Sequence, residues 1–228
     1  MDSSIRVRPH VARAVANAQH VLLDFDGVCF SMPDRRPPWE VLYALPRRPA
    51  DFYRIPTYGV PYLLGHLAAH EPDLAEAAEP IASALELDAA RTARMARGLP
   101  ALLDTCAARR LGAWVVGDLA ETAMRAGLRA HGLERRVVEI AGRQGLDGDT
   151  LGVVNVSLRA ARLLNVEPAR CLLVSGRSSV LRAATSSGLA VLGVPSGHDI
   201  RKWLSHDAPV VTNLERLGQA LTARGGKV

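Results

Sequence analysis

The stretch Val21-Leu22-Leu23-Asp24-Phe25-Asp26-Gly27-Val28 decides the fold. It begins as a short apolar run, which is typical of a strand buried on both faces of a sheet. It ends in two acids and a glycine. The period of two along a strand sends the Asp24 and Asp26 side chains the same way, and Gly27 permits a tight turn. In open parallel sheets, ligands bind at such carboxyl ends of strands.

Short apolar runs and amphipathic stretches alternate through the second half of the chain. This alternation predicts βαβ units with right-handed crossovers, and hence an α/β fold with a doubly wound parallel sheet. The strands expected after 21–25 are 113–116, 137–140, 171–174, 190–194 and 209–211. The expected helices are 10–18, 99–110, 119–131, 154–164, 178–187 and 214–222.

The segment that follows the first strand breaks this rhythm. It opens with a loop rich in Pro and Arg and then becomes helical over 60–70 and 74–95, with an interruption at Pro80. We find no strand pattern in it. The sequence therefore predicts a small helical insert, residues 32–98, between a first core segment, 1–31, and a second one, 99–228.

Composition excludes several classes of protein. The 228 residues carry a net charge of +5, but only 4% are aromatic, and the arginine pairs are dispersed among acids, so we expect no nucleic-acid partner. No apolar stretch approaches the ~20 residues needed to cross a bilayer, and no secretory signal is apparent. Three scattered cysteines predict neither a disulfide framework nor a zinc site, so we expect a cytoplasmic protein. Its oligomeric state stays open.

Two carboxylates side by side at a strand end are costly unless a cation or a chemical role accounts for them. One role suits this pair. Asp24 would attack phosphorus and form an aspartyl-phosphate, while Asp26 would give a proton to the leaving group and then take one from water. Gly27 would allow the turn to bring backbone amides to the phosphoryl oxygens.

The motif Asp24-Phe25-Asp26-Gly27-Val28 resembles that of the haloacid-dehalogenase (HAD) superfamily, from about residue 21 to 217. Residues 183–189 and 191–194 look like the family's fourth-motif helix and last core strand, and the helical insert sits where its small cap domain sits. The resemblance implies a HAD-like Rossmannoid core with a helical cap. It also implies phosphatase-type hydrolysis with Mg²⁺ held by Asp24 and by the carbonyl of Asp26.

The chain departs from the family pattern at the second motif, where a Ser or Thr hydroxyl should bind the phosphoryl group. Gly117 stands there instead, followed by Asp118. Gly117 still offers its N–H. The third motif, a lysine, falls near 151–152, and no lysine lies within 50 residues of it. Lys202 and Arg143 are the candidate substitutes, although an Arg fork differs from a Lys point charge.

The fourth motif should place a Mg²⁺-binding acid after the fourth strand. Gly176 takes its place here and Arg177 follows. The Mg²⁺ site that remains is weak, because hard oxygen ligands are missing. A guanidinium at Arg177 could instead take the cation's place by pairing with Asp24 and Asp26. The turn Ser175-Gly176-Arg177-Ser178 could also cradle an anion, so we count Ser175 and Arg177 with Gly27, Gly117 and Asp118 as phosphate-binding candidates.

Weaker signals have simpler explanations. His66 and His70 are four apart on an expected helix, but they lack a third metal ligand, so we interpret them as surface or interface histidines. Asp147 and Asp149 flank a glycine and read more simply as turn residues than as replacement carboxylates. Aromatic residues gather in the first half of the insert, where core packing, a pocket lining or a partner surface all stay open.

Two functions follow from this pattern. The first is a degenerate relative, a weak or inactive phosphatase that binds a phosphorylated ligand or a protein partner. The second is a working Mg²⁺-dependent phosphohydrolase with Asp24 as nucleophile, Asp26 as general acid and base, and replacement groups from Asp118, Asp149 or Lys202. We favour the first, because the loss of each oriented group typically costs ~10²–10³ in rate.

Overall fold

The computed structural model describes most of the chain. The described residues are 7–32, 38–55, 59–146, 152–195 and 205–224.

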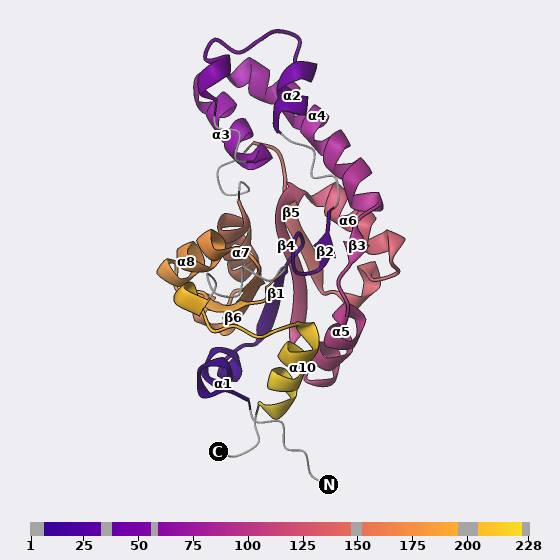
Figure 1. Cartoon of the computed structure of the whole chain (residues 1–228), viewed down its shortest axis with the longest axis vertical. Helices are drawn as coiled ribbons and strands as arrows, with labels where there is room; N and C mark the ends of the chain where they lie inside the picture. Colours follow the sequence, from indigo (N-terminus) through magenta and orange to yellow (C-terminus); the bar gives the residue numbers. More distant parts are fainter. Residues whose placement is uncertain (1–6, 33–37, 56–58, 147–151, 196–204, 225–228) are drawn as a thin grey trace.

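A five-stranded parallel sheet forms the centre of the molecule, with the strand order β5-β4-β1-β6-β7 (Figure 1). The central strand bonds to β4 on one side and β6 on the other. The chain therefore builds one half of the sheet and then crosses back to build the other, which confirms the doubly wound arrangement. The strands are β1 (His20–Asp24), β4 (Gly112–Ala120), β5 (Glu139–Arg143), β6 (Cys171–Ser175) and β7 (Ala190–Gly193).

Helices cover both faces of this sheet, and the alternation along β1 shows why. Val21 and Leu23 point into one apolar cluster, whereas Leu22 points into the other. The first cluster is covered by α1 (Pro9–Ala16), α5 (Leu99–Ala108), α6 (Glu121–Ala130) and α10 (Leu214–Ala223). The second is covered by α7 (Val153–Leu163) and α8 (Ser178–Ser186). Two 3₁₀ turns, η2 (Glu134–Arg136) and η4 (Pro168–Arg170), precede β5 and β6.

A helical region extends beyond the sheet, and we call it the cap. It lies between two short strands that pair antiparallel, β2 (Phe30–Ser31) and β3 (Arg94–Met95). It has an apolar cluster of its own, centred on leucines such as Leu63, Leu67 and Leu74. Figure 1 shows α4 running from this cluster back to the side of α6 in the core. The elements are α2 (Pro38–Ala44), η1 (Phe52–Arg54), α3 (Val60–His70) and α4 (Pro72–Arg91).

Several local expectations were wrong. The strand expected over 113–116 extends to Ala120, so the helix expected from residue 119 begins at Glu121. The helix expected over 74–95 begins at Pro72, passes through Pro80 without ending, and stops at Arg91. Buried alanines on either side of Pro80 pack helix α4 against the other cap helices, and this packing offsets the backbone hydrogen bond that proline cannot donate. The insert was expected to hold no strand, but β3 has only two residues, too few for any alternation to show. In place of the strand expected over 209–211, the structure has an isolated β-bridge between Gly193 and Val210.

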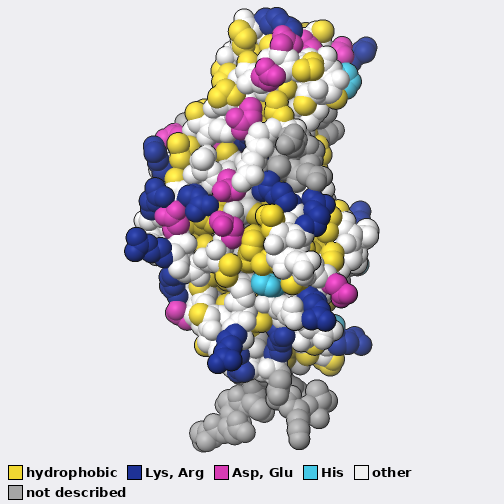
Figure 2. Space-filling view, turned by 180° about the vertical axis from the view of Figure 1, so that it is seen from behind, with side chains coloured by type: hydrophobic (Ala, Val, Ile, Leu, Met, Phe, Trp, Pro, Cys, Tyr) yellow, Lys and Arg dark blue, Asp and Glu magenta, His cyan; other side chains and the backbone are white. Residues whose placement is uncertain are grey.

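Charge is spread over the surface. Figure 2 shows, on the face in view, Lys and Arg side chains dispersed over the core among acidic ones. Among the described residues, no helix is both long enough and apolar enough to cross a membrane.

Candidate active site

Sheet topology brings three polar side chains together. The central strand β1 ends at Asp24, its neighbour β6 ends at Ser175, and its other neighbour β4 carries Asp118 near its end. Parallel strands put their carboxyl ends at one edge of the sheet, so these residues meet although they are far apart in the chain.

Arg177, directly before α8, ties this group together. Its Nη2 donates to Asp24 Oδ1 at 3.0 Å, and its Nε donates to Asp24 Oδ2 at 3.2 Å. The remaining arm, Nη1, donates to Asp118 Oδ2 at 2.7 Å. Ser175 Oγ also donates a hydrogen bond to Asp24 Oδ2, at 2.7 Å. The guanidinium thus bridges two carboxylates, and both oxygens of Asp24 accept hydrogen bonds from within the protein.

Asp24 is sealed from solvent, with 0% of its surface exposed. This burial raises the pKa of Asp24 to about 6, against the charge of Arg177 and the Ser175 hydrogen bond, while the charges of Asp118 and Asp26 raise it further. A nucleophile must present an oxygen to the atom it attacks. In this arrangement neither Asp24 oxygen is accessible to a substrate.

The turn after β1 uses its own amides. Gly27 has φ +93°, a left-handed conformation that glycine adopts without strain. Its N–H donates to the carbonyl of Phe30 at 2.7 Å, and the N–H of Cys29 donates to the carbonyl of Asp24 at 3.1 Å. Asp26 is half-buried, and its backbone forms an isolated β-bridge with Phe30. The turn was expected to bring backbone amides to a phosphoryl group, but these two amides are engaged within the turn.

Gly117 and Asp118 face opposite ways, as alternation along β4 requires. A Cβ at Gly117 would lie 2.7 Å from Met124 Sδ and 3.3 Å from Phe25 Cβ, in the packed layer under α6. Any side chain there would point into the core. Asp118, in contrast, reaches Arg177, so the acid after the second motif is the residue that β4 contributes to the site.

The residues present do not fit Mg²⁺. The carboxylate expected to hold the ion is taken by Arg177, and the acid expected after β6 is Gly176. Within the part of the chain that the structure describes, no three His, Cys, Asp or Glu side chains form a group able to hold a metal. The guanidinium supplies positive charge where a divalent cation would otherwise balance Asp24.

A second buried ion cluster joins the cap to the core, and the sequence did not indicate it. Arg143, on β5, is 2% exposed. It pairs with Glu79 of α4, and its Nη2 donates to Glu86 Oε2, also on α4, at 2.6 Å. The N–H of Ala120 donates to the same Glu86 oxygen at 2.7 Å. The signal that could have found this cluster is the spacing of Glu79 and Glu86, seven apart on one face of a helix.

Arg143 is thus the partner of two cap acids. The other candidate for the missing lysine, Lys202, lies outside the described residues, as do Asp147 and Asp149.

His66 and His70 stack with ring centroids 4.4 Å apart on α3, and His70 Nδ1 lies 3.0 Å from the carbonyl of His66. The anion cradle expected around Ser175 is used internally, since the N–H of Arg177 donates to Ser175 Oγ.

Solved structures of other proteins share this fold. A predicted phosphatase from Clostridium acetobutylicum matches with a TM-score of 0.67 at 17% identity, over 90% of this chain and 98% of that one. CbbY from Rhodobacter sphaeroides, solved with phosphate, matches at 0.60 and 20% identity over 90% and 99%. L-2-haloacid dehalogenase from Xanthobacter autotrophicus matches at 0.55 and 18% identity over 90% and 98%. No protein-family model matches the sequence, and no curated protein matches it significantly. The chain has the HAD-like fold that the sequence motif indicated.

Proposed function

We propose that this chain is a HAD-fold protein whose phosphoryl-transfer site has become a buried ion cluster, leaving a weak or inactive phosphatase that acts by binding. The observation that carries the proposal is the Arg177 guanidinium on a fully buried Asp24. A phosphate monoester approaching this edge would meet Asp24, Asp26 and Asp118 against one arginine already shared between two of them. Repulsion therefore opposes both binding and attack.

The magnitude of the loss supports the same conclusion. The hydroxyl of the second motif, the lysine of the third and the acid of the fourth are all replaced at their expected positions. One such group typically contributes ~10²–10³ in rate, and although such losses do not add, several kcal/mol of transition-state stabilisation should be missing.

The second candidate is the working phosphohydrolase. It is favoured by the retention of both Asp24 and Asp26, but it requires Arg177 to leave Asp24. Hydrolysis of p-nitrophenyl phosphate with and without Mg²⁺ separates the two. We expect no turnover above background, and no change in Asp24→Asn or in the control Asp104→Asn, whose target side chain is 75% exposed. Turnover that needs Mg²⁺, disappears in Asp24→Asn and persists in Asp104→Asn would establish the phosphohydrolase.

We propose a protein partner and a cytoplasmic location for this chain. A phosphorylated ligand is disfavoured by the acids at the cleft, whereas a protein partner is supported by exposed aromatic side chains on the cap, among them Tyr43 and Tyr53. A cytoplasmic location is supported by three buried free thiols, whose pKa values burial raises, to about 11 for Cys106 and Cys171.

A further inference from the structure

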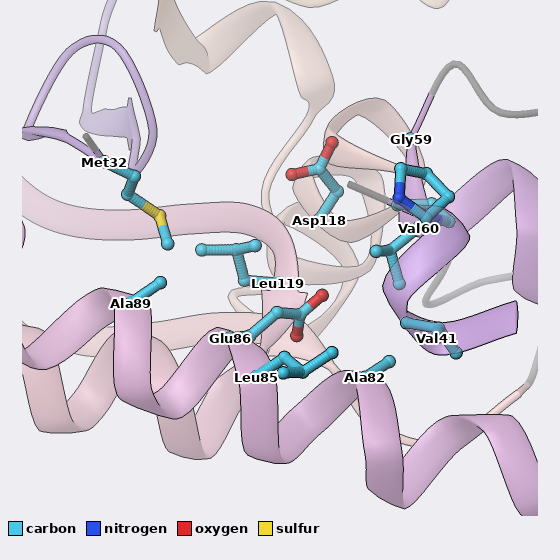
Figure 3. Close-up of a pocket in the computed structure, with 12 residues that line it drawn as sticks. Met32, Val41, Gly59, Val60, Ala82, Leu85, Glu86, Ala89, Asp118 and Leu119 are labelled. Carbon is cyan, nitrogen blue, oxygen red and sulfur yellow. The ribbon is translucent and has the colours of Figure 1, made fainter. Parts of the chain in front are cut away.

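A pocket opens between the cap and the end of β4 (Figure 3). Its volume is about 80 Å³, room for several non-hydrogen atoms. Most of its wall is apolar. Val60 of α3, Ala82 and Leu85 of α4, and Leu119 of β4 belong to this apolar wall. Such a wall suits the hydrocarbon part of a small molecule.

Two acids, Glu86 and Asp118, are the charged residues among the described residues that line this pocket. Figure 3 shows the Glu86 carboxyl directed from α4 into the pocket, below Asp118. Its Oε2 accepts from the N–H of Ala120 and from Arg143. Its Oε1 is buried and, within the described residues, has no hydrogen-bond partner. Buried carboxyl oxygens are normally satisfied, so this atom points to a hydrogen-bonding ligand.

The charge around the pocket indicates what kind of ligand. Arg143 is shared by Glu79 and Glu86, and Arg177 by Asp24 and Asp118. Each of these two arginines therefore faces two acids, and negative charge is in excess when all are ionised. Burial raises the pKa of Glu86 to about 7, and the charge of Asp118 raises it further against Arg143, so these acids influence one another. An anion is disfavoured here, and a cation would relieve the repulsion.

We propose that this pocket binds a small primary amine, with its hydrocarbon body against Val60, Leu85 and Leu119 and its ammonium group donating to Oε1 of Glu86. The inference goes beyond the proposed function, because a disabled phosphatase site requires no ligand here. It is also independent of any reaction at Asp24, since amine binding changes no covalent bond.

Isothermal titration of the full chain with cyclohexylamine tests the proposal, with cyclohexanol, cyclohexanecarboxylate and inorganic phosphate as matched probes. We expect saturable binding of the amine, at least about tenfold tighter than binding of the carboxylate or of phosphate, as one charge-assisted hydrogen bond provides. Glu86→Gln should weaken the amine about tenfold while changing cyclohexanol less than about threefold. That difference separates loss of charge from loss of shape.

Val60→Trp fills the pocket from the cap and removes no charged group from either ion cluster, so it keeps the test valid if Glu86→Gln does not fold. It should abolish amine binding, whereas Tyr62→Ala, an exposed control on the same helix, should leave it unchanged. Equal affinity for amine and carboxylate, amine binding that survives Val60→Trp, or no saturable binding at millimolar amine would each overturn the proposal. Because p-nitrophenyl phosphate turnover is measured separately, failure of amine binding leaves the proposed function standing, and the reverse also holds.

Discussion

Arg177 and Asp24, 153 residues apart in the chain, form a two-point ion pair in which Nη2 and Nε of the half-buried guanidinium each donate to the fully buried carboxylate. An arginine fork matches a carboxylate in this geometry better than a lysine point charge does. The pair forms because β1 and β6 are neighbours in the sheet and Arg177 follows β6 by two residues. It places a fixed organic cation on the acid that the sequence marks as a nucleophile.

Removing the two partners of this pair should have unequal costs. Arg177→Gln leaves Asp24 facing Asp118 without their shared cation, so we expect a loss of roughly 3–5 kcal/mol in the free energy of unfolding. Asp24→Asn should cost less, because it removes a buried charge and leaves Arg177 paired with Asp118. Urea unfolding of both variants and of the double variant should give a coupling energy of about 0.5–3 kcal/mol. Additive losses would mean that the pair does not form.

Restoring the second motif by Gly117→Ser should destabilise the protein without restoring hydrolysis. The new Cβ would lie 2.7 Å from Met124 Sδ in a packed layer, and overpacking of this kind typically costs about 1–3 kcal/mol. Gly117→Ala, which adds the same Cβ, should cost a similar amount. In thermal unfolding, the double variant Gly117→Ser/Met124→Ala should lose less stability than the sum of the losses of the two single variants. If Gly117→Ser gains phosphatase activity, its side chain must point to Asp24, contrary to the structure.

Glu86 predicts a pH dependence of stability. Its pKa is raised to about 7 in the fold, above its ordinary value of 4.5, so the folded state holds this proton more tightly than the unfolded chain does. Its contribution to stability is therefore lost as pH rises from about 4.5 to 7. The charged groups facing Glu86 are Arg143 from β5, Asp118 from β4 and Glu79 from its own helix.

The comparison with Glu86→Gln isolates this effect, since the variant cannot titrate there. The free energy of unfolding of the wild type, relative to Glu86→Gln, should be lower at pH 8 than at pH 5. Urea unfolding at both values measures it. A difference of the opposite sign would show that Arg143 outweighs burial and holds Glu86 ionised throughout this range.

Buried Arg143 should contribute more to the free energy of unfolding than exposed Arg129. Arg143→Met leaves Glu79 and Glu86 without their cation between cap and core, and we expect a loss of about 3–5 kcal/mol in the free energy of unfolding. Arg129→Met breaks a pair with Glu134 in which the arginine side chain is 70% exposed, and it should cost less than about 1 kcal/mol. Similar losses in denaturant unfolding would contradict the buried cluster.

Much of the fold could be predicted because its signals are local. The apolar run before Asp24 and the period of the following segments indicate strand and helix directly, and α3 begins and ends where its pattern predicted. The two-residue strands β2 and β3 could not be predicted, because they depend on each other across the whole cap.

The site was predictable in its residue types rather than in its pairings. The replacement of an acid by Gly176 and Arg177 is visible in the sequence, and pairing of Arg177 with Asp24 could be anticipated from it. The second partner of Arg177 is Asp118, where the sequence suggested Asp26. The spacing of Glu79 and Glu86 could have marked an acidic helix face, but not its partner Arg143, because helix α4 and strand β5 meet only once the cap is in place.

A crystal structure determined in buffer that contains Mg²⁺ and inorganic phosphate tests the central claim most directly. The account predicts Arg177 within hydrogen-bonding distance of Asp24 and Asp118, with no metal ion on Asp24. A six-coordinate Mg²⁺ between Asp24 and the carbonyl of Asp26, with Arg177 turned away from both, would contradict it.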